Sequence, residues 1–135
     1  MSERTVEQVM EGFRAMGRGD VEAIVALADP DVEFVNPDTA LEPGTRHGPE
    51  GLRAGMAAFL EAFRDLRFDF DRVVDMDDRV VVTGTFRARG RGSGMELPAA
   101  PYAVVVTQRD GKLVRYEWFN TPAEALDAAG VPSDV

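Results

Sequence analysis

RVVVTGTFRARG, residues 79–90, is rich in β-branched residues and reads as a long β-strand. The same period of two recurs in the neighbouring segments RFDFDRVV (67–74), PYAVVVTQ (101–108) and LVRYEWFN (113–120). Asp110 and Gly111 form a pair typical of a hairpin turn between the last two of these strands. The second half of the chain therefore predicts a mainly antiparallel sheet.

Helical spacing replaces this alternation on both sides of the sheet segment. The expected elements are helices at residues 6–16, 21–28, 49–63 and 122–129, a strand at 32–36 and a loop at 37–48. Thr5 with Gln8 is placed to cap the first helix, Asp20 to cap the second and Thr121 to cap the last, which Gly130 ends. Helices that precede an antiparallel meander predict an α+β fold, in which they cover the concave face of a curved sheet. The whole chain, residues 1–135, is expected to form one such cone-shaped domain with an apolar pocket.

Composition excludes several classes of function. The net charge of −9 disfavours binding to nucleic acid or to an anionic membrane surface, and no apolar run approaches the roughly 18 residues of a membrane span. The chain has no cysteine and a single histidine, His47, so we expect neither disulfides nor an imidazole- or thiolate-based metal site. We expect a cytoplasmic protein that needs no cofactor.

Two stretches carry a resemblance to a known superfamily: GDVEAIVALADPDVEFVNP at residues 19–37 and GKLVRYEWFNTPAEALDAAG at residues 111–130. Together with the order of the elements, they make the chain similar to nuclear-transport-factor-two-like proteins. Within these, it looks most like the branch of SnoaL-like polyketide cyclases and ketosteroid isomerases. This resemblance implies the cone fold, a pocket for a small hydrophobic molecule and pairing of sheets in a homodimer. It does not imply one activity, because the fold serves many.

The resemblance to ketosteroid isomerase fails at its catalytic positions. The general base would fall on Asn36, and an amide cannot take a proton from carbon. The helix position of the tyrosine donor falls on Gly12 or Phe13, and the strand position of the acid donor falls on Ala103 or Val104. The standard isomerase mechanism is therefore not expected.

Limonene epoxide hydrolase is similar at two positions, Asn36 and Glu117, but the central strand offers Thr83, Thr85 and Arg87 where the hydrolase has an Arg-x-Asp. Strict alternation places Glu117 on one face of its strand together with Leu113, Arg115 and Phe119, and the resemblance implies that this face is concave. A carboxylate in an apolar pocket has a raised pKa, which suits acid–base catalysis. The alternative is that Glu117 forms a structural ion pair.

Two further side chains are candidate catalytic groups beside Glu117. Asn36 could orient a ligand carbonyl or a water, or it could simply start a turn before Pro37. His47 could act as a general base at the pocket mouth, or be a solvated loop residue. Arg87, Arg89 and Arg91 share a face and could bind an anion or decorate a solvated strand.

Apolar side chains are expected to line the pocket as well as fill the core. The candidate ligand-binding residues are Phe13, Met16, Phe34, Met56, Phe59, Phe63, Phe86 and Phe119. The opposite strand face, with Val114, Tyr116 and Trp118, looks too apolar to be solvated and predicts a homodimer contact. The leading hypothesis is a cofactor-independent enzyme of the cyclase, isomerase or hydrolase type that uses Glu117 and Asn36. The alternatives are a non-catalytic binding protein and a dimeric association module.

Overall fold

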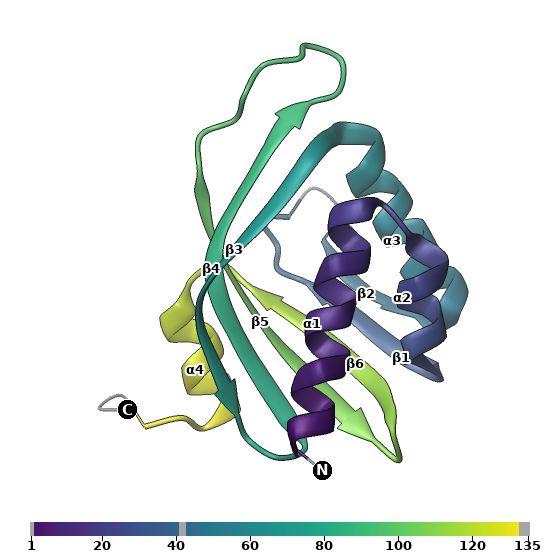
Figure 1. Cartoon of the computed structure of the whole chain (residues 1–135), viewed down its shortest axis with the longest axis vertical. Coiled ribbons are helices and arrows are strands. Elements are labelled where there is room, and N and C mark those ends of the chain that lie inside the picture. The colour runs from purple at the N-terminus through teal and green to yellow at the C-terminus, as the bar shows by residue number, and fades with distance from the viewer. Residues whose placement is uncertain (1, 41–42, 133–135) are drawn as a thin grey trace.

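The structure is a computed structural model that describes residues 2–40 and 43–132 (Figure 1). Its elements follow the order α1 (Ser2–Arg18), α2 (Val21–Leu27), β1 (Ala28–Asn36), β2 (Gly44–His47), α3 (Gly48–Ala62), β3 (Phe63–Asp75), β4 (Arg79–Gly90), β5 (Ala100–Arg109), β6 (Lys112–Phe119) and α4 (Pro122–Ala129). The strands form one curved sheet in the order β2-β1-β6-β5-β4-β3, antiparallel except for the parallel pair β1 and β6. The predicted α+β fold with helices over a curved sheet is confirmed.

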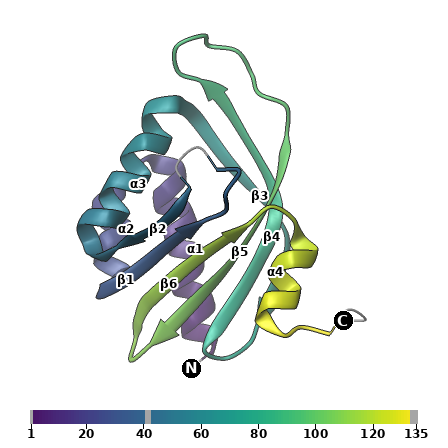
Figure 2. The ribbon, with the colours of Figure 1, turned by 180° about the vertical axis from the view of Figure 1, so that it is seen from behind.

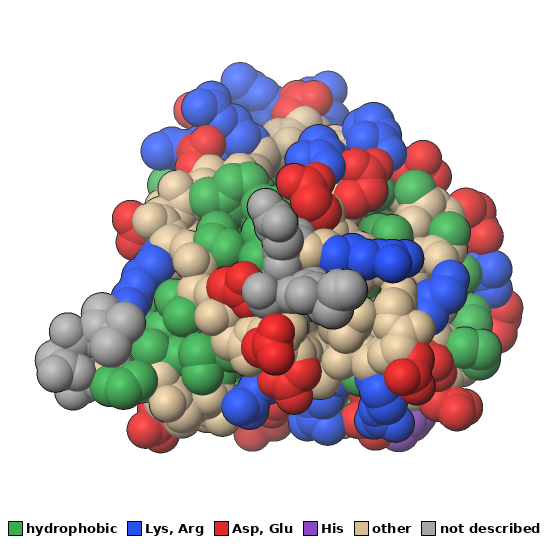
Figure 3. All heavy atoms as spheres, turned by 60° about the horizontal axis from the view of Figure 1, so that its bottom comes forward, with side chains coloured by type: hydrophobic (Ala, Val, Ile, Leu, Met, Phe, Trp, Pro, Cys, Tyr) green, Lys and Arg blue, Asp and Glu red, His purple; other side chains and the backbone are tan. Residues whose placement is uncertain are grey.

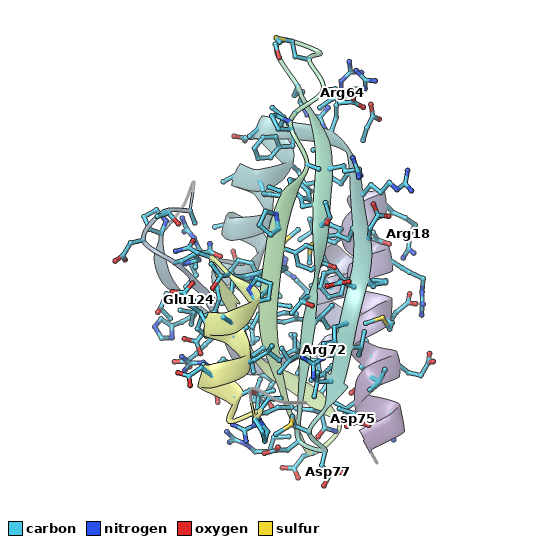
Figure 4. The ribbon with its side chains drawn as sticks, turned by 90° about the vertical axis from the view of Figure 1, so that its left-hand side faces the viewer. Arg18, Arg64, Arg72, Asp75, Asp77 and Glu124 are labelled. Carbon is cyan, nitrogen blue, oxygen red and sulfur yellow. The ribbon has the colours of Figure 1, made fainter. Side chains whose placement is uncertain are left out.

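The helices divide between the two faces of the sheet. The first three, α1, α2 and α3, lie over the concave face, whereas α4 packs on the opposite, outer face, as the view from behind shows (Figure 2). α4 packs against β5, β4 and β6, and Figure 4 shows it in a side view together with Arg72, which lies on β3. The two buried clusters follow this division: a large one lies under the first three helices, and a small one lies under α4.

Local signals set most of the boundaries. Asp20 caps α2, accepting a hydrogen bond from the Ala23 amide at 3.2 Å, and Thr121 forms the capping box that opens α4. The cap predicted at Thr5 is wrong, because α1 begins at Ser2. Inside that helix, Gln8 instead donates to the Gly111 carbonyl at 2.7 Å, which fastens α1 to the hairpin between β5 and β6.

One strand lies where the sequence predicts only a loop. Within residues 37–48, β2 pairs antiparallel with β1, and its residues Gly44–His47 are polar and mostly exposed. It is an edge strand, so its side chains lack the apolar alternation that signals a half-buried strand. Residues 41–42 of the predicted loop lie outside the described residues.

A β-bulge in β6 reverses the faces that strict alternation predicts. Thr107 pairs with Arg115 and the next residue of β5, Gln108, pairs with Leu113, so β6 carries one extra residue, Val114, between these pairs. Leu113 still points into the concave core, but after the bulge Tyr116 takes the core side. A shift of one residue moves every later side chain to the other face of the sheet.

Charge covers much of the surface. Figure 3 shows acidic and basic side chains interspersed over one end of the molecule, with hydrophobic side chains in small groups between them. No helix in the described part of the chain is both long and apolar enough to cross a membrane.

Candidate functional site

A cavity of about 310 Å³ lies between the concave face of the sheet and the helices. Its wall is formed by Met16, Phe34, Asn36, Pro37, Ala40, Gly55, Met56, Phe59, Phe63, Phe68, Phe86, Ala100, Pro101, Tyr102 and Trp118. Among these described lining residues there is no Asp, Glu, His, Lys or Arg. The cavity is therefore a predominantly apolar site with a few polar atoms, which is typical of sites for small organic molecules.

The wall is held by a continuous set of aromatic contacts. Trp118 lies near the centre of the concave face, with ring centroids 6.2 Å from Phe13, 6.3 Å from Phe34 and 6.3 Å from Tyr102. Toward the end of α3, the rings of Phe59 and Phe86 lie 5.4 Å apart. Edge-to-face and tilted pairs of this kind each add about 0.5–1.5 kcal/mol beyond area burial, so these contacts stabilise the wall.

Two glycines allow the wall to close tightly. A Cβ on Gly84 would lie 2.9 Å from the Tyr102 hydroxyl oxygen and 2.0 Å from the Asp69 carbonyl oxygen, so only glycine lets that ring cross β4. On α3, a Cβ on Gly55 would lie 3.4 Å from the Phe34 ring and 3.3 Å from the Arg46 side chain. The helix can therefore lie close to β1 and β2 at the cavity.

Three polar side chains reach the wall: Asn36, Tyr102 and Trp118. The Tyr102 hydroxyl and the Trp118 indole nitrogen are buried and have no hydrogen-bond partner among the described residues. Burial, with a smaller contribution from the negative charge of Asp69, raises the pKa of Tyr102 well above its ordinary value, so its hydroxyl stays protonated. Two residues of the wall thus carry a hydrogen-bond donor that is itself buried, with almost no accessible surface.

Hydrogen bonds join segments next to the cavity lining at two places. On one side the Thr39 hydroxyl donates to the Asn120 side-chain oxygen, which ties the segment containing Pro37 and Ala40 to the end of β6. On the other side, Arg91 donates from its backbone amide to the Ala62 carbonyl at 3.0 Å.

The Arg91 side chain adds further bonds to the same helix end. Its Nε donates to the Leu60 carbonyl at 2.8 Å, and its second nitrogen donates to the Phe63 carbonyl at 3.4 Å. The bond to Leu60 satisfies a carbonyl in the last turn of α3, which would otherwise have no partner in the helix, and the bond to Phe63 reaches the first residue of β3. They hold Phe59 and Phe63 on the cavity wall.

Glu117 lies on the outer face, so the expectation that it points into the cavity is wrong. It pairs across the sheet with Val105, which packs under α4. Its carboxylate lies 3.4 Å from the Arg115 guanidinium, which in turn donates to Glu33 at 2.8 Å. The physical cause is the bulge at Val114, and the geometry agrees with the alternative that Glu117 forms a structural ion pair.

The histidine also belongs to this outer network. His47 Nδ1 lies 3.8 Å from the Glu33 carboxylate, and the His47 side chain is 71% exposed. The structure therefore brings His47 and Glu117 together through Glu33 and Arg115, on the side of the sheet away from the cavity. Of the three candidate catalytic residues, Asn36 alone lines the cavity.

Most of the candidate ligand-binding residues lie on the wall: Met16, Phe34, Met56, Phe59, Phe63 and Phe86. Phe13 is buried behind the wall, against Trp118 and Tyr102. The placement of Phe119 in the pocket is wrong, because the bulge turns it to the outer face, where it packs against the cluster under α4.

The predicted dimer surface is wrong for the same reason. Tyr116 is only 4% exposed and Trp118 packs in the concave core, so neither is available on the outer face. The sequence shows aromatic residues at 116 and 118, but the face of the sheet to which they point depends on the bulge. Phe68, Tyr102 and Trp118 lie in strands with the same alternating pattern as residues outside the wall, so local sequence does not identify them as wall residues.

Comparison with known proteins agrees with this architecture. The model of the SnoaL-like domain matches residues 6–116. The chain belongs to the SnoaL-like domain family. Among curated proteins, none matches the chain. The predicted resemblance to SnoaL-like and nuclear-transport-factor-two-like proteins is thus confirmed.

Solved structures include close relatives in fold. The SnoaL-like chain is 25% identical to TerC, which was co-crystallised with polyporic acid, with a TM-score of 0.76 over 92% of this chain and 98% of TerC. An NTF2-like protein of unknown function from Burkholderia pseudomallei K96243 is 24% identical, with a TM-score of 0.77 over 92% and 95% of the two chains. A proposed polyketide cyclase from Xanthomonas campestris pv. campestris is 19% identical, with a TM-score of 0.76 over 90% and 93%. The last two show the fold alone.

Proposed function

We propose that this SnoaL-like protein binds a small, flat, hydrophobic molecule in the cavity under α3. The observation that carries the proposal is the cavity wall itself, which is built from aromatic, methionine and small side chains. Such walls bind apolar rings through shape and dispersion. The similarity to TerC, which was co-crystallised with polyporic acid, supports a small organic ligand.

Binding is favoured over acid–base catalysis by the placement of the titratable groups. Glu117 and His47 lie on the outer face, and the described cavity lining contains no carboxylate or imidazole. A general acid or base must lie within hydrogen-bond reach of the reacting atom. The two residues predicted to move protons are therefore separated from the ligand by the sheet.

The proposal can be tested by blocking access to the cavity with a larger side chain. Ala100 lies on the cavity wall and is exposed, whereas the neighbouring Ala99 is exposed but does not line the cavity. We expect a neutral acyl-dimethylaminonaphthalene dye to bind the wild type saturably, with the emission shift of an apolar environment. Ala100→Phe should weaken this binding at least about tenfold by filling the mouth, and Ala99→Phe should leave it unchanged. Equal binding to all three proteins would place the dye elsewhere and contradict the proposal.

A homodimer stays a prediction, but the side chains of Tyr116 and Trp118 cannot form its interface. Light scattering at micromolar concentration tests it, and a monomeric mass would contradict it.

A further inference from the structure

The hairpin between β4 and β5 presents an exposed methionine. Figure 1 shows this segment, residues 91–99, at the end of the molecule opposite the N-terminus. Met95 is 67% exposed, compared with 48% for Phe70, the next most exposed large hydrophobic residue in the described part of the chain. Backbone bonds order the turn: Gly94 donates to the Gly90 carbonyl at 2.8 Å, and Gly90 donates to the Met95 carbonyl at 2.9 Å. The exposure of Met95 is therefore built into an ordered turn.

The apolar surface continues from this turn toward the cavity. Residues 97–101 have the sequence LPAAP and carry no polar side chain. All of them except Leu97 are exposed, and the last two, Ala100 and Pro101, line the cavity. Single exposed hydrophobic residues are common on proteins, but a contiguous apolar run is typical of a contact surface.

Two arginines place positive charge beside Met95. The Arg89 guanidinium donates to the Gly94 carbonyl at 3.2 Å. The Arg64 guanidinium also lies against Gly94, because a Cβ on this glycine would be 3.4 Å from its nitrogen. Figure 4 shows Arg64 at the hairpin end of the molecule. Both charged groups therefore lie at the residue that immediately precedes Met95.

Strand pairing concentrates arginine at this end of the sheet. Arg64 on β3 is directly opposite Arg89 on β4, and Arg67 is directly opposite Arg87. Like charges that face each other across two strands are destabilising. Asp69 offsets this repulsion at one pair, since it accepts from Arg67 at 3.0 Å and from Arg87 at 3.2 Å.

Two arginines at this end have no carboxylate beside them among the described residues. The Arg89 guanidinium lies 3.6 Å from the Asp65 carboxylate and 4.0 Å from the Glu96 carboxylate. Arg64 forms no ion pair with a described residue. Arg91 donates to backbone carbonyls, which carry no formal charge. The hairpin end therefore keeps positive charge that the described part of the protein does not pair.

The charge of the protein is unevenly distributed. The facing strand ends and the hairpin, residues 63–69 and 86–97, carry five arginines and three acidic residues. The chain as a whole has a net charge of −9, so its acidic excess lies outside these segments. Attraction between exposed charges acts over about 10 Å at moderate ionic strength. The hairpin end is therefore suited to an anionic surface, although the net charge of the whole chain disfavours one.

We propose that the tip of the β4–β5 hairpin docks on an anionic lipid surface. Met95 enters the apolar layer, and the guanidinium groups of Arg64 and Arg89 bind lipid phosphates. A lipid surface is favoured over a soluble anion because the exposed apolar residues accompany the charge. The docking does not rest on the proposed function, but it brings Ala100 and Pro101 of the cavity lining close to the lipid.

Sedimentation with lipid vesicles tests the docking. The wild type should bind vesicles made of phosphatidylcholine and phosphatidylglycerol in equal parts, and it should bind vesicles of phosphatidylcholine alone at least about fivefold more weakly. Arg64→Gln removes one charge near the surface and should lower binding to the mixed vesicles roughly fivefold. Met95→Ser removes the inserted side chain and should lower it roughly tenfold.

Matched controls make the same changes away from the hairpin. Arg4→Gln removes one exposed arginine, whose guanidinium lies 4.0 Å from a Cβ built on Gly111, in the hairpin at the opposite end of β5. Val73→Ser removes an apolar side chain that is 39% exposed and pairs with Val82, toward the other end of β4. Both variants should keep wild-type binding, and circular dichroism checks that every variant is folded.

Four results would overturn the docking. The first is no wild-type binding to the mixed vesicles, which is what the net charge alone predicts. The second is equal loss in the hairpin variants and in the controls, because the attraction would then be diffuse. The third is full binding by Met95→Ser, because nothing would then be inserted. The fourth is release by inorganic phosphate at an ionic strength at which chloride does not release the protein, because the arginines would then bind free anions. None of these results changes the test of the cavity.

Discussion

The two faces of β6 differ in how their polar groups are satisfied. On the outer face, the Arg115 guanidinium lies between the carboxylates of Glu33 and Glu117, and His47 lies near Glu33, so these polar groups have partners within the protein. On the concave face, Trp118 is surrounded by aromatic rings, and its indole N–H has no partner among the described residues. Glu117 and Trp118, which are adjacent in β6, thus lie in different environments. The charged groups of the outer face have partners within the protein, whereas the indole N–H on the concave face is buried among aromatic rings.

The largest expected effect on the free energy of unfolding comes from replacing Trp118 by alanine, compared with the same change at its neighbour Glu117. Trp118→Ala should lower the free energy of unfolding by about 3 kcal/mol, because it removes a large ring from the concave core. Glu117→Ala should lower it by less than about 1 kcal/mol, because partly exposed ion pairs contribute little. Urea unfolding followed by circular dichroism measures both. The reverse order would mean that the faces of β6 are assigned wrongly.

A smaller effect is expected at an arginine that joins the sheet to the helical layer. Arg91→Ala removes side-chain hydrogen bonds to the Leu60 and Phe63 carbonyls and should lower the free energy of unfolding by about 1 kcal/mol. Arg87→Ala is the control, since Arg87 forms an exposed pair with Asp69 and should cost less than about 0.5 kcal/mol. Equal losses in thermal or urea unfolding would argue against a capping role for Arg91.

A still smaller change in the free energy of unfolding, of opposite sign, is expected at Tyr116. The Tyr116 hydroxyl is buried without a partner among the described residues, and burial raises its pKa. Tyr116→Phe removes a polar group that gains no bond, so stability should stay the same or rise by up to about 1 kcal/mol. A clear loss of stability in urea unfolding would show that this hydroxyl is hydrogen-bonded in solution.

The smallest expected effect is on how stability depends on pH, through Asp69 on the outer face. Hydrogen bonds from Arg67, and then from Arg87, hold the pKa of Asp69 below its ordinary value. This stabilisation is present above the unfolded-state pKa of about 3.9 and is lost as pH falls through the lower folded-state pKa. Asp69→Asn should flatten the acid limb of the stability profile slightly, while Asp71→Asn on the same strand should leave it like the wild type. Identical profiles for all three proteins would contradict the role of Asp69.

The sequence predicted the architecture because the strongest signals are local. The period of two in residues 79–90, the Thr121 capping box and the Asp20 cap all act within a few residues and all appear in the structure. The polar edge strand β2 has no such pattern, and only its pairing with β1 defines it. Local sequence patterns cannot predict a strand that is defined only by its pairing with a neighbouring strand.

The candidate site was predictable only in part. Phenylalanines and methionines at helical spacing gave much of the wall, because amphipathic helices bury those faces. The orientation of residues 115–119 was not predictable by alternation, because one extra residue at Val114 reverses it. That single shift moved Glu117 and Phe119 out of the cavity and brought Trp118 into it.

The most direct test of the account uses the single tryptophan of the chain, Trp118, which lies on the cavity wall. Its fluorescence is followed while acetylnaphthalene is added to the wild type, Glu117→Gln and Ala100→Phe. The account predicts the same saturable change for the wild type and Glu117→Gln, and a much weaker response for Ala100→Phe. Loss of the response in Glu117→Gln with full retention in Ala100→Phe would contradict it, because binding would then depend on the outer face.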